Sequence, residues 1–196
     1  MPLSFPSVGI QSLNMRLKRS VAVSESPFSF DQQAYEHQGA RWECEVTLPA
    51  LNYAEAKSVQ AFIVGLKGRS GTFTFGSPLH TSTATATVTT AAIRAESFTT
   101  TAGSSAVAAG DYFQLGDYLY MATVDKASGA NVLSFQPPLR AAVTTSTALD
   151  FTLPKSLWRL SSNDTGWSVD TDLRLRLPRL YNEQNIKHRD AGGCGC

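Results

Sequence analysis

The end of the chain carries the residues with the strongest chemical character. Cys194 and Cys196 are separated by a single glycine. Two thiolates at this spacing can both bind a soft metal ion or an iron–sulfur cluster, and His188 or Cys44 could supply further ligands. Such sites use four ligands, however, and three cysteines give no second pair. Two interpretations stay open. One is an iron–sulfur or zinc site that other residues complete, and the other is a flexible tail of residues 186–196 whose thiols are free or oxidised to a vicinal disulfide-like product.

The other reactive residues form no catalytic arrangement in the sequence. The histidines His37, His80 and His188 make no H-x-x-x-H pair, and neither a Gly-x-Ser-x-Gly elbow nor a phosphate-binding glycine loop is present. Asp170 and Asp172 lie two residues apart beside arginines, which favours solvated ion pairs over acid–base catalysis. We therefore predict that the protein is not an enzyme and, apart from the terminal cysteines, holds no cofactor.

The composition restricts the kind of partner. The chain has 196 residues, a formal net charge of +1 and only 17% charged residues. A non-specific nucleic-acid surface needs clustered lysines and arginines, which a near-neutral chain does not favour. No apolar run reaches the length of a transmembrane helix, so we expect no membrane partner. Abundant Thr, Ser and Ala favour β structure with neutral surfaces, of the kind that neighbouring subunits cover.

Alternation of apolar and polar residues predicts two strands in the first quarter of the chain. The first covers residues 12–24 and the second residues 40–49. In the second, Trp42, Cys44 and Val46 share one face, which places Cys44 among core residues as a small hydrophobe. The first has a cationic side that we interpret as solvated or facing a neighbouring subunit: Arg16, Lys18 and Arg19.

One helix is predicted, over residues 53–66. Asn52 and Glu55 have the types and spacing of a capping box at its start. The apolar residues that follow recur at helical spacing and give one buried stripe. Gly68 suits the C-terminal cap, because glycine adopts the left-handed backbone conformation without strain. A short glycine-bounded strand follows within residues 71–76.

The middle of the chain reads as three short antiparallel strands. They cover residues 112–115, 118–124 and 132–135, and a Gly-Asp turn joins the first two. Prolines 137 and 138 then end the pairing, since proline has no N–H to donate to a neighbouring strand. We expect Phe113 and Tyr120 to lie in the core of this unit.

Threonine-rich tracts flank these strands and mark a change in composition. They lie at residues 81–90, 99–109 and 141–148, and they have little apolar surface to bury. We interpret residues 81–149 as an insertion with its own small β-barrel.

After the insertion, the alternating pattern of the N-terminal half returns. Residues 157–160 and 167–178 alternate, and we interpret the second segment as one long strand or two joined ones that close the sheet. The expected organisation is a discontinuous domain of residues 1–80 plus 150–185, interrupted by the insertion.

Three stretches together resemble the distal tail proteins of long-tailed, siphovirus-like bacteriophages and related tail-like particles. The resemblance spans about residues 12 to 180. Its central motif is Ala-Gly-Asp-Tyr-Phe-Gln-Leu-Gly-Asp-Tyr-Leu-Tyr, followed later by Pro-Pro-Leu-Arg. The stretches are Trp42–Pro49 with its helix and Gly68–Gly76, then Ala109–Tyr120 with Pro137–Arg140, and finally the region of Trp158 and Trp167.

The resemblance implies an antiparallel β-sandwich with one flanking helix, in a subunit that assembles as a ring, commonly of six copies. Members often carry an inserted β-barrel of oligonucleotide/oligosaccharide-binding (OB) or galectin-like type. The ring would be part of the virion tail, assembled in the host cytoplasm, and would join the tail tube to the tail-tip hub or baseplate. The implied partners are further copies of the chain, the tail tube protein, the hub or baseplate proteins and the tape measure protein.

Two further points follow from the resemblance. DNA would pass through the lumen of the ring without specific binding. Some related tail-tip proteins hold an iron–sulfur cluster through a C-terminal cysteine set, but this chain has too few cysteines to form that set alone.

A binding module is the alternative function. Tyr112, Tyr118 and Tyr120 could stack on sugars, in which case the insertion of residues 81–149 would recognise carbohydrate or another part of the host surface. Joint exposure of these rings would favour that function, whereas burial would favour a structural role.

Overall fold

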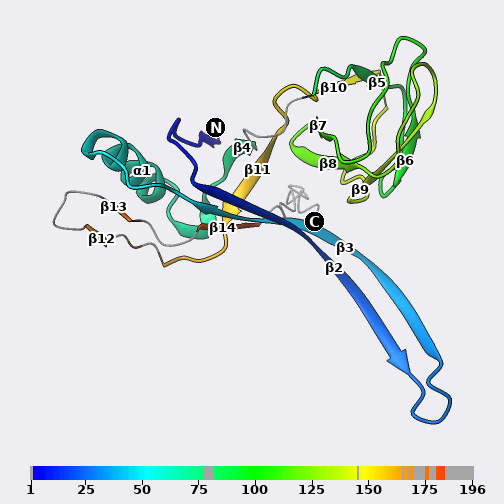
Figure 1. Cartoon of the computed structure of the whole chain (residues 1–196), viewed down its shortest axis with the longest axis horizontal. Coiled ribbons are helices and arrows are strands. Elements are labelled where there is room, and N and C mark those ends of the chain that lie inside the picture. The colour runs from blue at the N-terminus through cyan, green and yellow to red at the C-terminus, as the bar shows by residue number, and fades with distance from the viewer. Residues whose placement is uncertain are drawn as a thin grey trace, which may run out of the picture.

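The computed structural model describes residues 2–76, 82–144, 146–164, 166, 168–169, 175–176 and 180–183. Strands account for 45% of the structure and helical residues for 10%, so the predicted mainly β class is confirmed. Figure 1 shows three parts: a sheet beside the helix α1, a second β unit made by β5 to β10, and a long hairpin that leaves the body.

Six strands form the sheet beside the helix, which we call the body sheet. Its first two strands are parallel and all other neighbours are antiparallel. The spatial order is β1 (Leu3–Ser4), β4 (Phe73–Gly76), β11 (Lys155–Leu160), β14 (Leu180–Glu183), β3 (Gln32–Thr47) and β2 (Ser12–Glu25). Strands β1 and β2 are therefore the two edges.

The helix α1 (Tyr53–Gly65) forms at the predicted place but ends one residue earlier, and Lys67 rather than the predicted Gly68 is the first left-handed residue after it. The Asn52 side chain accepts a hydrogen bond from the Glu55 N–H, and the Glu55 carboxylate accepts one from the Asn52 N–H. Lys67, with φ 52°, takes the left-handed conformation that ends the helix, and a short 3₁₀ helix, η1 (Gly68–Ser70), follows. Among the described residues, no helix has the length and apolar character needed to cross a bilayer.

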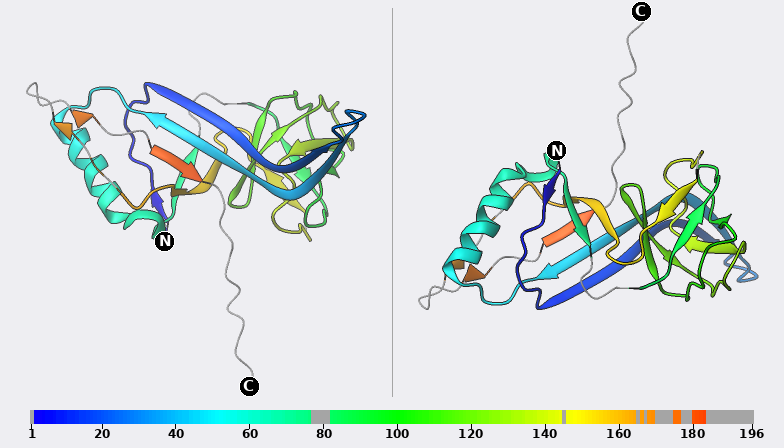
Figure 2. Two further views of the ribbon diagram at one scale, coloured as in Figure 1. Left: turned by 90° about the horizontal axis from the view of Figure 1, so that it is seen from below. Right: turned by 90° about the horizontal axis from the view of Figure 1, so that it is seen from above.

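Burial of one apolar stripe holds the helix against the sheet. The stripe consists of Ala56, Val59, Phe62 and Ile63. Phe62 meets the ring of Phe73 on β4 edge to face, with 5.3 Å between ring centroids. In both views of Figure 2, α1 lies at the end of the molecule opposite the second β unit.

The segment that completes the body sheet differs from the predicted one. Strands β12 (Ser168–Val169) and β13 (Leu175–Arg176) pair with each other in antiparallel register, so residues 167–178 are not one long strand. The gap between β11 and β3 is filled by β14, where the sequence shows no alternation. Strand β14 has only four residues but forms backbone hydrogen bonds with a neighbour on each side. These bonds hold it in the sheet although its sequence has no alternating apolar pattern.

The second β unit contains the three predicted strands, with ends that differ by one or two residues. A four-stranded sheet has the order β6 (Ser97–Thr99), β9 (Val132–Gln136), β8 (Tyr118–Ala122) and β7 (Tyr112–Leu115). Strands β5 (Ala86–Val88) and β10 (Thr147–Leu149) form a separate pair. Among the described residues these strands do not close into a barrel, in contrast to the sequence-based expectation.

Local hydrogen bonds explain why the threonine- and serine-rich tracts add so little strand. The Ser104 and Ser105 hydroxyls accept hydrogen bonds from the N–H groups of Thr87 and Thr85, respectively. The Thr100 hydroxyl donates to backbone carbonyls of a neighbouring loop. Such contacts satisfy backbone groups that a sheet would otherwise pair.

Aromatic rings fill the second β unit, as predicted. Phe113 is fully buried and Tyr120 is 1% exposed, and their rings stack with centroids 5.5 Å apart. The Tyr120 hydroxyl oxygen accepts a hydrogen bond from the Arg140 N–H at 3.2 Å. Burial raises the pKa of Tyr120 to about 12, so this side chain stays neutral.

Strand β8 belongs to both hydrophobic cores. Leu119 packs in the core of the body sheet, whereas Tyr120 and Ala122 pack in the core of the second β unit. The Trp42 indole N–H on β3 donates to the Leu119 carbonyl oxygen at 3.0 Å, and its ring lies 5.6 Å from that of Tyr112. Alternation along one strand therefore fastens the two units together.

Removal of this indole hydrogen bond tests the junction. Trp42→Phe leaves the Leu119 carbonyl buried without its donor, and we expect a loss of about 1–2 kcal/mol in the free energy of unfolding. Urea denaturation checks this value. Tyr53→Phe, at an exposed ring on α1, is the matched control and leaves stability nearly unchanged. Equal stability of the two variants would contradict the assigned role of Trp42.

Candidate assembly surface

The hairpin of β2 and β3 extends well beyond the body. We call residues 20–37 the arm (Figure 1). Five residue pairs, from Val21 with Glu36 to Glu25 with Gln32, and a turn give it a length of about 20 Å at ~3.4 Å per residue. The arm was not predicted, because its only signal in the sequence is the proline and two phenylalanines at residues 27–30 between two strand patterns.

An irregularity in the pairing marks the root of the arm. Arg19 pairs with Ala40 and Val21 with Glu36, so three residues of β3 lie opposite the single Ser20 of β2. A bulge of this kind bends a hairpin and increases its twist. Because β3 gains two residues at the bulge rather than one, side chains that share a face of the ribbon before the bulge still share that face beyond it.

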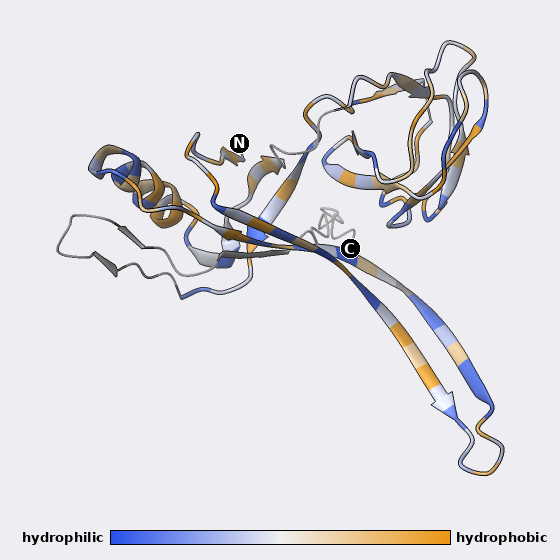
Figure 3. Cartoon of the chain, viewed as in Figure 1, coloured by the Kyte–Doolittle hydropathy of each residue, from blue (hydrophilic) through white to orange (hydrophobic). Residues whose placement is uncertain are grey.

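The continued faces expose apolar side chains. Five of the twelve large hydrophobic residues exposed in the described part of the chain lie on the arm: Val21, Val23, Phe28, Phe30 and Tyr35. In Figure 3 the outer part of β2 is hydrophobic, whereas the paired part of β3 is mostly hydrophilic. Isolated exposed apolar residues are common, but their concentration on one projecting segment is typical of a surface that another molecule covers.

The turn at the end of the arm holds a phenylalanine in an unfavourable backbone conformation. Phe30 has φ 58°, in the left-handed region that favours glycine, and its side chain is 74% exposed. The Phe30 N–H donates to the Ser26 carbonyl oxygen, and the Ser26 N–H donates to that of Asp31, both at 2.9 Å. The described structure offers the ring no packing to offset a strain of about 1–2 kcal/mol, which suggests a contact outside the chain.

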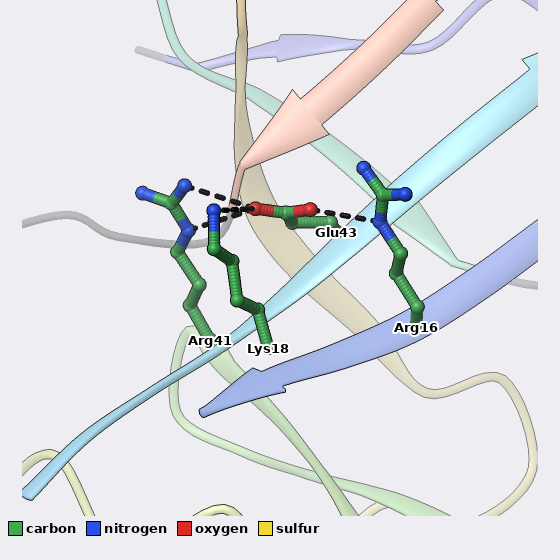
Figure 4. Close-up of polar contacts among 4 residues, drawn as sticks. All are labelled: Arg16, Lys18, Arg41 and Glu43. Atoms are coloured by element: carbon green, nitrogen blue, oxygen red, sulfur yellow. Dashed lines mark hydrogen bonds and ion pairs between the residues drawn. The ribbon is translucent and has the colours of Figure 1, made fainter. Parts of the chain in front are cut away.

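A buried carboxylate holds the two strands together just inside the root. Glu43 accepts a hydrogen bond from Arg16 Nε at 2.8 Å and one from Arg41 Nη2 at 2.9 Å, and Lys18 Nζ lies at 3.7 Å (Figure 4). Burial by itself raises the pKa of Glu43, but the hydrogen bonds from Arg41 and Arg16 and the charge of Lys18 lower it below its ordinary value overall.

The cationic side of β2 predicted from the sequence lies at this place. Arg16 and Lys18 are largely exposed and contact Glu43, and Arg19 pairs with Glu36 at 2.9 Å. The residues that the sequence could only describe as solvated or subunit-facing therefore surround the root of the arm.

The structure describes one of the three cysteines, Cys44. Cys44 is buried, and burial together with the charge of Glu45 raises the pKa of its thiol to about 12, so the thiolate that a metal requires is disfavoured. Cys194, Cys196 and His188 lie outside the described residues. Within the described part, no group of three or more His, Cys, Asp or Glu side chains is placed to hold a metal ion.

Of the other residues considered for catalysis, the structure describes His37. His37 lies on the arm, where its ring contacts that of Tyr35 at 4.9 Å, and His80, Asp170 and Asp172 lie outside the described residues.

A buried lysine in the second β unit, Lys126, had no recognisable signal in the sequence. Its Nζ donates to the carbonyl oxygens of Ser105 and Ala127 at 2.9 and 3.0 Å, and burial lowers its pKa. This lysine ties loops together, which is a structural role.

Acid titration tests the role of Glu43. A carboxylate with a lowered folded-state pKa contributes stability that is complete above its unfolded value of about 4.3 and is lost as the pH falls through the folded pKa. We expect Glu43→Gln to reduce the free energy of unfolding by about 1 kcal/mol at pH 7, with a difference from wild type that shrinks as the pH falls through the lowered pKa of Glu43.

Urea denaturation between pH 7 and 3 measures this difference. The control is Glu36→Gln on the same strand, because its ion pair with Arg19 is exposed and contributes little. Parallel pH profiles for wild type and Glu43→Gln would show that the ion cluster does not stabilise the strand pair.

The sequence matches no protein-family model and no curated protein with significant similarity. Functional inference therefore depends on the geometry of the arm and on the sequence motifs.

Proposed function

We propose that this protein is a structural subunit of a phage-type tail. It assembles as a homo-oligomeric ring, with six copies as the expected number, and joins the tail tube to the tail-tip hub or baseplate. The observation that carries this proposal is the arm, a projecting β-ribbon with exposed apolar side chains and a strained, exposed Phe30.

The edges of the body sheet suit such an assembly. Strands β1 and β2 lie at opposite edges, so each subunit has two different surfaces on which neighbours can dock. Unequal docking surfaces produce head-to-tail contacts, which close into a ring when the rotation between subunits permits it. Exposed strand edges are also a common source of unwanted association, and a ring that covers them removes this hazard.

The two β units would occupy different positions in the assembled tail. In this proposal the body sheet and α1 belong to a sandwich-type ring domain of residues 1–80 and 150–185. The second β unit, which corresponds to the predicted insertion of residues 81–149, lies on the outside of the ring. The further partners are the tail tube protein, the hub or baseplate proteins and the tape measure protein, and DNA passes through the lumen without specific contacts.

The arrangement of the tyrosines gives less support to carbohydrate binding. Tyr120 is buried, Tyr112 packs against Trp42, and Tyr118 is partly buried against the core of the second β unit. These rings therefore do not offer the shared exposed face that stacking on a sugar needs.

Light scattering after gel filtration, combined with electron microscopy of stained particles, tests the ring. We expect closed rings with a mass several times that of the monomer. A chain that stays monomeric at all accessible concentrations, with no annular particles, would contradict the proposed assembly.

Substitution of Phe30 separates assembly from folding. We expect Phe30→Gly to leave the free energy of unfolding unchanged or raised by up to about 1 kcal/mol, because glycine relieves the left-handed strain. The same change should raise the protein concentration needed for assembly at least tenfold, because it removes an apolar contact. Ile93→Thr, at an exposed apolar residue of the second β unit, is the control and should assemble normally. Normal assembly of Phe30→Gly would exclude this residue from the interface.

The absorbance spectrum of the same preparation tests the terminal cysteines. We expect a colourless protein, because burial of Cys44 leaves each chain with only two cysteines for a cluster. A broad visible band that is lost in Cys194→Ser would instead assign the tail to an iron–sulfur site.

A further inference from the structure

The root of the arm is a cationic groove. A hollow of about 480 Å³ is lined by four cationic side chains, and its remaining lining residues are the small Ser20, Gly39 and Ala40. The cations come from both strands of the hairpin and from the second β unit: Lys18, Arg19, Arg41 and Arg140. Arg140 Nη2 donates to the Ala40 carbonyl oxygen, which fixes this arginine against the arm.

Nearby carboxylates do not balance these charges. Arg16 brings the number of cations at the root to five, and Glu43 and Glu36 pair with four of them. Glu45 lies on the same side of β3 as Glu43, so two positive charges remain in excess among the described side chains. Arg94 and Glu96 line the adjoining hollow and cancel each other. The groove is therefore suited to carboxylates.

The opposite end of the arm has the complementary charge. Between Ser20 and Tyr35 the chain contains two charged residues, Glu25 and Asp31, and both are exposed carboxylates. They flank the exposed rings of Phe28 and Phe30. The paired strands hold this tip about 20 Å from the root of the same chain, so it cannot fold back into its own groove.

We propose that the acidic tip of one arm docks in the cationic root groove of the next copy of the chain. The small lining residues Ser20, Gly39 and Ala40 leave room for the phenylalanine rings, and the cationic side chains of the groove receive the carboxylates. Tip and root are different surfaces, so the contact is head-to-tail and can propagate around a ring. This inference rests on the proposed ring function and names the contact that would build the ring.

Charge reversal at each end separately gives a direct test. The tip variant is Glu25→Lys with Asp31→Lys, and the root variant is Arg19→Glu with Arg140→Glu. Each variant alone places like charges at every contact, so we expect each to need at least a tenfold higher concentration to assemble. The tip variant lies outside both hydrophobic cores and is informative even if the root variant unfolds.

A mixture of the two variants provides the decisive comparison. In an alternating ring every tip meets a root of opposite charge, so an equimolar mixture should recover assembly. A chain with all four substitutions should recover it as well. The matched control is Asp117→Lys with Asp164→Lys, two exposed carboxylates that line neither the groove nor the adjoining hollow, and it should assemble like wild type.

The outcomes separate the contact from the ring. Suppose that wild type forms rings. If the single-end variants then assemble equally well, the proposed tip-to-root contact is wrong but the ring is supported. The same conclusion holds if both variants are folded and their mixture does not assemble. If wild type forms no ring, both fail. If inorganic phosphate saturates the groove without affecting assembly, the groove is an anion site unrelated to the neighbouring arm.

Discussion

The alternation of side chains along β3 is the constraint on which the rest of the structure depends. Trp42 lies on the buried side, where its indole N–H binds Leu119 and joins the two β units. The adjacent residues Arg41 and Glu43 lie on the other side, where they form the ion cluster at the root of the arm. A shift of register by one residue would exchange these sides and lose both the junction and the ion cluster.

The position of Glu43 shows how the arm can be held rigid without a core of its own. A two-stranded ribbon in water is marginally stable, because neither face is covered. Here three cations converge on one poorly exposed carboxylate immediately before the ribbon leaves the body. The two strands are thus already paired where the arm begins. A partner that covers the arm would supply the stabilisation from apolar burial that the free arm lacks.

The exposed apolar residues of the arm and the left-handed backbone of Phe30 both favour a role in assembly. A free monomer would be at least as stable with glycine at this turn and with polar residues on the outer part of β2. Residues that lower the stability of the monomer are expected where contacts in the assembly stabilise them. The near-neutral composition fits this view, because neighbouring subunits would cover surfaces that isolated proteins usually keep charged.

The sequence by itself determined the mainly β class, the capped helix, the hairpin strands of the second β unit and the burial of Phe113 and Tyr120. Periodicity and capping are local, so residues a few positions apart are sufficient to specify them. Only the tertiary structure decided the place of β14, the open sheet of the second unit, the length of the arm and the gathering of Arg140 with Arg19 at its root. Each of these depends on pairing between residues far apart in the chain, and no local pattern records which distant backbone or charge will become a neighbour.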